Sequence, residues 1–213
     1  MSTEVLTLTQ WLSPAYPVGA FAYSHGLETV IAEGTVHNAQ TLQRWLTDVI
    51  AEGSGRSDCI LLRAAYHAPD PASLAEIDAT ARAFAPSAER LQETVLQGAA
   101  FGATTQAIWD HPPQELTYPV ALGAAARQAE LDVDLTAAMY LQAFTSNLVS
   151  AATRALPLGQ TEGQRVLAAL TPLCTRIATE TATSTLDNLA SCAWRADIAS
   201  MQHETLQPRI FKS

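Results

Sequence analysis

Apolar residues recur at helical spacing along nearly the whole chain. The clearest example lies between Asn38, a candidate N-cap, and Gly53, a stop signal. Its apolar positions follow the i, i+3, i+4, i+7, i+8 pattern that one buried face of a helix requires: Leu42, Trp45, Leu46, Val49 and Ile50. This segment is therefore expected to be an amphipathic helix.

The same pattern, read with capping residues and prolines, predicts helices elsewhere in the chain. They are expected over 57–67, 71–84, 87–109, 118–130 and 134–156, with caps at Asp70, Ser87 and Asp134 and a stop at His111-Pro112-Pro113. Thr161 to Gln164 reads as a capping box that opens a last long helix, which contains Pro172. No convincing strand-like alternation occurs, and no linker marks a boundary. We expect one all-α domain over residues 1–213, a bundle of about eight to ten helices with a flexible C-terminal tail.

Composition adds an imbalance to this picture. Of the 213 residues, 48% are hydrophobic and 15% are charged, against roughly 25% charged in a typical soluble domain. So apolar a chain is not disordered. Apolar surface that charges would normally dilute must therefore be covered in some way.

The charges themselves exclude several functions. Twelve basic residues against 21 acidic ones give a formal net charge of -9, which opposes binding to nucleic acid or to an anionic membrane surface. The only lysine, Lys212, is next to last in the sequence. Because a P-loop needs a lysine inside the pattern GxxxxGK[ST], this chain is not a P-loop nucleotidase.

No motif specifies an active site or a metal site. Cys59, Cys174 and Cys192 are too far apart for a metal motif or a disulfide framework, and they read as small buried hydrophobes. No two histidines are spaced to share a helix face, and Glu89 and Glu93 read as a solvated stripe. Without signal-peptide features at the N-terminus, a reduced, cytoplasmic protein is expected.

Small residues cluster at 98–103 and 123–126, where they would let helix backbones approach closely. A glycine inside a helix costs about 1 kcal/mol relative to alanine unless such packing offsets it. This observation supports one alternative function, an all-α metabolic enzyme with a pocket among the small-residue helices.

Two segments carry more sequence information than connectors need. The first, 12–28, places two prolines and two glycines around aromatic rings and hydroxyls. The second is the end of the chain, 196–213, where apolar residues alternate with His203, Glu204 and Arg209. Because terminal tails are usually frayed and polar, these apolar anchors suggest docking to a partner.

These segments resemble the UreF family of urease accessory proteins. SPAYPVGAFAYSHGLE, beginning at Ser13, is similar to the family's N-terminal signature. Residues 147–165 resemble its central motif, and 197–213 resemble its C-terminal tail. Two departures are visible: Ala22 stands where serine is common, and Cys192-Ala-Trp-Arg195 precedes the tail where threonine and proline are frequent.

The resemblance implies an all-helical homodimer that is not an enzyme. Such a protein binds a UreD-type (UreH-type) accessory protein and recruits the UreG GTPase, and the assembly delivers nickel to apo-urease. No cofactor is expected to bind tightly, because nickel passes transiently through the complex. Whether an arginine of this chain acts in trans on the GTPase nucleotide, or the chain only organises the GTPase, stays open at this point.

The resemblance also suggests which residues meet partners. The tail at 196–213 is expected to dock on the UreD-type protein, and the N-terminal signature is expected to contribute assembly contacts. The tail candidates are Ile198, Met201, His203, Glu204, Arg209 and Phe211, and the signature candidates are Tyr23, Ser24, His25 and Glu28. His203 is, in addition, a candidate for a position near the nickel path.

Overall fold

A computed structural model describes residues 3–110 and 115–213, and every regular element within them is helical. The all-α prediction is therefore confirmed. The α-helices are α1 (Thr3–Trp11), α2 (Leu27–Ala32), α3 (Ala39–Glu52), α4 (Ser54–His67), α5 (Pro71–Ala83), α6 (Ala88–Trp109), α7 (Tyr118–Gln128), α8 (Val133–Ala155), α9 (Gln160–Glu180) and α10 (Trp194–His203). Short 3-10 helices occupy Ala20–Ala22, Thr181–Thr183 and Leu186–Asn188.

The predicted caps are largely confirmed. The side chains of Asn38, Asp70 and Ser87 accept hydrogen bonds from backbone N–H groups in the first turns of α3, α5 and α6. Two caps were wrong. Asp132, not Asp134, caps α8, because its Oδ1 accepts the Leu135 N–H at 2.7 Å. Likewise α9 begins at Gln160, so the supposed capping box from Thr161 lies inside the helix.

The segment 111–113, which was expected to stop α6, lies outside the described residues. The helix α6 itself ends at Trp109, as predicted. Asp110 closes the helix in the left-handed region with a φ of 56°. The helix α9 runs through Pro172 to Glu180.

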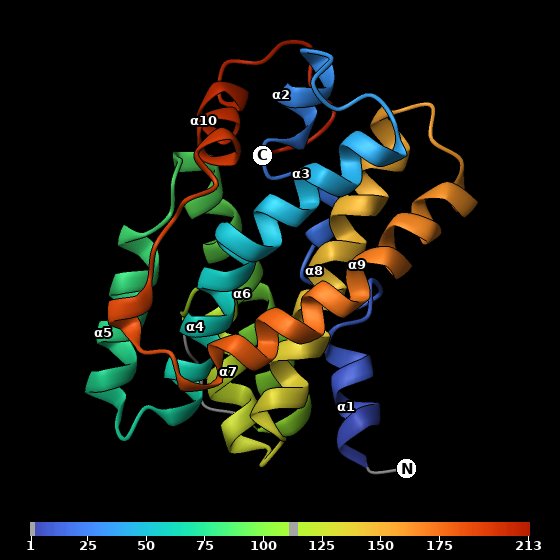
Figure 1. Ribbon diagram of the computed structural model, residues 1–213. Helices are drawn as coiled ribbons and strands as arrows, with labels where there is room; N and C mark the ends of the chain where they lie inside the picture. The colour runs from blue at the N-terminus through green and yellow to red at the C-terminus, as the bar shows by residue number, and fades with distance from the viewer. Residues whose placement is uncertain (1–2, 111–114) are drawn as a thin grey trace.

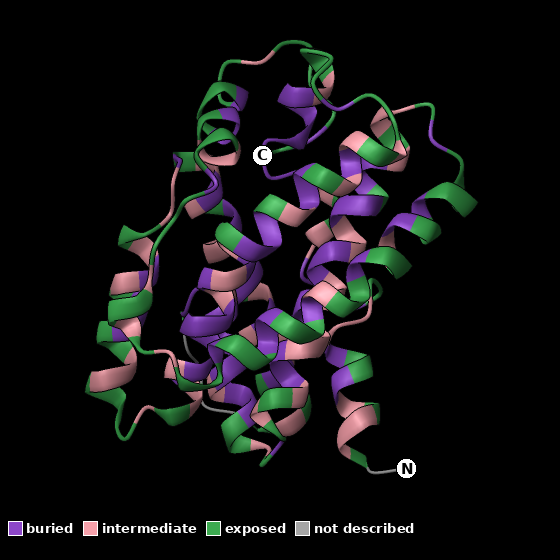
Figure 2. Ribbon diagram, viewed as in Figure 1, coloured by how far each residue is buried: buried purple, intermediate pink, exposed green. Residues whose placement is uncertain are grey.

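The interior is formed by α4, α6, α7 and α8, with α3 and α9 laid across them (Figure 1). Buried residues gather on the facing sides of these helices, while their outer sides are exposed (Figure 2). The small-residue clusters act where backbones meet. A Cβ added at Gly98 would lie 2.0 Å from the Leu116 carbonyl oxygen, and one at Gly123 would lie 2.1 Å from that of Leu62. These glycines are therefore required for close helix packing.

At the end of the molecule far from the N-terminus, α2 and α10 lie together with the last residues of the chain (Figure 1). The two segments that the sequence singled out, 12–28 and 196–213, thus meet at this end of the molecule. Within the described residues, no helix is long and apolar enough to cross a membrane.

Candidate functional site

The N-terminal signature turns sharply before α2 because two glycines adopt left-handed backbone. Gly19 and Gly26 have φ of 72° and 74°, and His25, directly before Gly26, has a φ of 55°. A Cβ at Gly26 would lie 2.6 Å from the Ser200 nitrogen, so α10 packs directly against this turn. The turn directs Ser24, His25 and Glu28 toward the interior.

The C-terminal tail returns to the same turn and packs on it. The Lys212 N–H donates to the Ala22 carbonyl at 2.8 Å, and the Ser24 N–H donates to the Ser213 carbonyl at 2.7 Å. Phe211 is buried, and the Arg154 guanidinium carbon lies 4.6 Å from its ring centroid. The tail is therefore bound in cis by the chain's own signature and α8.

His203 lies at the centre of this contact and has no exposed surface. Its Nδ1 is 2.7 Å from Glu89 Oε2 and its Nε2 is 3.1 Å from Glu28 Oε2. Glu28 also accepts the N–H groups of Ile210 and Phe211, at 2.6 and 2.9 Å. Three elements, α2, α6 and α10, are joined to the tail through these groups.

A second cluster of buried polar side chains, centred on His25, lies beside the cluster around His203. His25 Nε2 is 2.8 Å from Glu93 Oε1 and 2.9 Å from Arg90 Nη1, and Arg90 pairs with Glu93. Burial alone would raise the pKa of Glu93, but the charge of Arg90 and the contacts with His25 lower it to about 2. Burial and the neighbouring Arg90 lower the pKa of His25. The Ser213 hydroxyl donates to Glu93 at 2.8 Å.

The start of α6 is held by α10. The Ser87 and Ser200 hydroxyl oxygens are 2.5 Å apart, and the Ala88 N–H donates to Glu204 Oε1 at 2.8 Å. A carboxylate at a helix N-terminus both accepts a free N–H and complements the helix dipole. Glu204 is therefore an additional cap supplied from the tail.

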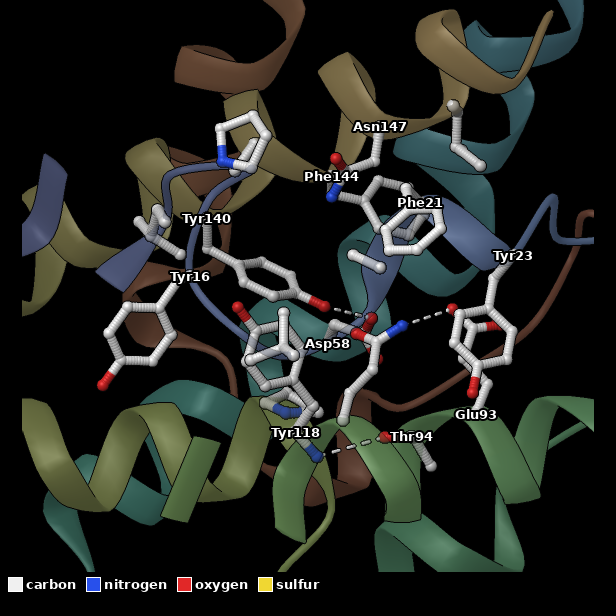
Figure 3. Close-up of a pocket in the computed structure, with 18 of the residues that line it drawn as sticks. Tyr16, Phe21, Tyr23, Asp58, Glu93, Thr94, Tyr118, Tyr140, Phe144 and Asn147 are labelled. Atoms are coloured by element: carbon white, nitrogen blue, oxygen red, sulfur yellow. Dashed lines mark hydrogen bonds between the residues drawn. The ribbon is translucent and has the colours of Figure 1, made fainter. Parts of the chain in front are cut away.

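A pocket opens beneath the signature, and Figure 3 shows its lining. Tyr16, Tyr118 and Tyr140 contribute rings, and Asp58 lies near the middle, where the Tyr140 hydroxyl donates to its Oδ2 at 2.6 Å. Burial raises the pKa of Asp58 to about 6, an effect that Arg90 and Tyr140 oppose. The pocket is aromatic, and its ionisable groups Asp58 and Glu93 already have partners in the protein. Its lining includes Thr94 and Gln97 of α6 and Tyr118 and Pro119 of α7, and these two helices carry the small-residue clusters.

The family model for UreF matches residues 36–171 of this chain. The chain belongs to the UreF family. Three curated relatives, all named urease accessory protein UreF, agree over the full length. The protein of Ruegeria sp. (strain TM1040) is 57% identical and that of Cereibacter sphaeroides (strain KD131) is 56% identical, each covering all of this chain and 99% and 100% of the relative. That of Roseobacter denitrificans is 53% identical and is covered to 96%.

Membership of the UreF family makes this a urease accessory protein, and the family is one of chaperones that are not enzymes. The resemblance found in the sequence is thus confirmed. Among the described residues, no group of three histidine, cysteine or acidic side chains is arranged to hold a metal ion.

The residues expected to meet partners fall into two sets in this UreF-family protein. Ile198, Met201, Glu204 and Arg209 are exposed, although Glu204 caps α6 and Arg209 pairs with Glu89. The others are buried and contact the chain itself: Tyr23, Ser24, His25, Glu28, His203 and Phe211. Residues 196–213 are packed against the body, and flexibility of this tail stays a prediction.

The sequence interpretation was wrong for the carboxylates of α6. Glu93 is 3% exposed and Glu89 side chain is 12% exposed, so neither belongs to a solvated stripe. One signal pointed inward: Glu93, Gln97 and Phe101 recur every four residues and so share the face that Phe101 buries. The cysteine interpretation holds for Cys59 and Cys174, whereas Cys192 is exposed.

Proposed function

We propose that this UreF-family protein joins a UreD/UreH-type accessory protein to the UreG GTPase, as a homodimer, for nickel delivery to apo-urease. The observation that carries the proposal is an apolar outer face on α10. Trp194, Ile198 and Met201 recur at i, i+4 and i+7 and are 71%, 52% and 51% exposed. Ile210, 69% exposed, comes from the tail held against the same end. Exposed apolar clusters of this kind are typical of protein–protein interfaces.

The division of chemistry in this proposal follows from charge and composition. Without a lysine before Lys212, the chain holds no P-loop, so UreG supplies GTP hydrolysis. Nickel is cargo that passes transiently, and no tightly bound cofactor is proposed. With a net charge of -9, neither nucleic acid nor an anionic membrane is a proposed partner, and the site of action is the cytoplasm.

The decisive test is co-purification with the UreD-type protein and UreG. Truncation after Arg195 is a poor probe, because it would also remove the buried His203 and Phe211. We propose Ile198→Asp and Met201→Asp instead, with Leu96→Asp as the matched control, since Leu96 is 47% exposed and lies on α6, eight residues beyond the Ala88 that contacts Glu204. An interface anchor replaced by a charge should weaken binding by roughly 100-fold.

The α10 variants should lose the UreD-type protein and, with it, UreG, while Leu96→Asp assembles normally. Equal assembly of all three variants would refute docking through α10. GTP turnover by the isolated chain would contradict the assignment of hydrolysis to UreG.

A further inference from the structure

The environment of His203 defines the protonation state of its ring. Both ring nitrogens face carboxylate oxygens, Nδ1 at 2.7 Å from Glu89 and Nε2 at 3.1 Å from Glu28. An ionised carboxylate only accepts hydrogen bonds, so each nitrogen must donate. A neutral imidazole would place one lone pair against a carboxylate oxygen in a site that excludes water. The geometry therefore favours a ring in which both nitrogens carry a proton.

The charges around the ring agree with this requirement. The side chains that face this cluster are Glu28 from α2, Glu89 from α6 and Arg209 from the tail. With a neutral His203, one negative charge would stay uncompensated beside a fully buried ring. With an imidazolium, two carboxylates face two cations and the cluster is neutral. Buried charges persist when they are paired and hydrogen-bonded in this way.

Both carboxylates that face His203 also bind the tail. Glu28 accepts the N–H groups of Ile210 and Phe211, and Glu89 pairs with Arg209. We propose that His203 is a buried imidazolium that fixes these two carboxylates and so holds residues 209–211 in their docked position. In this proposal His203 is a positioning residue, because it acts through Glu28 and Glu89. Only its consequence for presenting Ile210 beside α10 rests on the proposed function.

The first test reads the ring directly. Nitrogen-15 NMR of the full-length chain at pH 7 distinguishes an imidazolium from either neutral tautomer, and the His203 signals are assigned by their loss in His203→Gln. We expect both ring nitrogens to be protonated. A neutral tautomer would overturn the proposal.

The second test reads the tail. Trypsin cleavage after Arg209, followed by mass spectrometry as the loss of residues 210–213, reports how often the tail leaves its site. Breaking a buried ion pair should accelerate this cleavage about 100-fold in His203→Gln. His67→Gln, which changes an exposed histidine, should cleave at the parent rate. An unchanged rate in His203→Gln would refute the proposal.

A variant that leaves the histidine in place covers the case in which His203→Gln fails to fold. Glu89→Gln removes one of the two charges that face the ring and frees Arg209. It should also speed cleavage after Arg209, and an unchanged rate would count against the proposal. Both tests use the isolated chain, so they can fail while α10 still binds its partner, and the reverse also holds.

Discussion

Gly26 offers a sharp test of how the signature holds α10. Its φ of 74° is left-handed, and an added Cβ would lie 2.6 Å from the Ser200 nitrogen and 2.8 Å from the Ala199 carbonyl carbon. Gly34 has nearly the same backbone, with a φ of 76°, but no atom lies within 4 Å of its added Cβ. The pair therefore separates backbone strain from the close approach of two elements.

The expected loss of stability follows from these two effects, backbone strain and close packing. Left-handed backbone costs an alanine about 1–2 kcal/mol, which both variants share. Overpacking against the backbone of α10 adds about 1–3 kcal/mol in Gly26→Ala alone. We therefore expect Gly26→Ala to lower the free energy of unfolding by about 2–5 kcal/mol and Gly34→Ala by about 1–2 kcal/mol.

Urea unfolding followed by circular dichroism measures this free energy, and trypsin cleavage after Arg209 shows whether α10 and the tail have moved. In Gly26→Ala the cleavage should accelerate, because the displaced α10 carries His203 away from Glu28. Equal destabilisation of the two variants, with equal tail protection, would refute the claim that α10 packs against the signature through Gly26.

Two further predictions concern ionisable groups. Burial raises the pKa of Asp58 from 3.8 to about 6, so its ionisation opposes folding. The stability of the protein relative to Asp58→Asn should fall as pH rises from about 4 to 6, by about 2–3 kcal/mol in urea unfolding, and a pH-independent difference would contradict it. Burial raises the pKa of Cys59 and Cys174, whereas Cys192 is exposed. One thiol should thus react quickly with Ellman's reagent in the native protein, and rapid reaction of all three would contradict this packing.

The helices could be predicted because their signals are local. Asn38, Asp70 and Ser87 each cap the helix that directly follows, and such a contact spans three residues. Where two residues offered the same signal, the sequence could not choose between them. Asp132 and Asp134 are both able to cap, and only the packed position of α8 decides for Asp132.

The sequence singled out the signature and the tail, but it could not show which of their residues contact one another. The sequence predicted Phe211 as an anchor that docks on a partner, and periodicity does not say which surface buries it. The structure buries Phe211 against the chain's own Arg154, and pairs Glu28 with a histidine 175 residues away. Contacts over such separations depend on the whole bundle, which brings α2, α6 and α10 to one end.

The apolar residues of this weakly charged chain serve two purposes, and α10 shows both. The inner face of α10 carries Ala199 and His203, which are buried against α2 and α6, while the outer face carries Ile198 and Met201. A substitution on the inner face should therefore change stability and partner binding together, because the outer face moves with it. A substitution on the outer face should change partner binding and leave the free energy of unfolding within about 0.5 kcal/mol. That difference separates the apolar surface that folds this protein from the surface that assembles it.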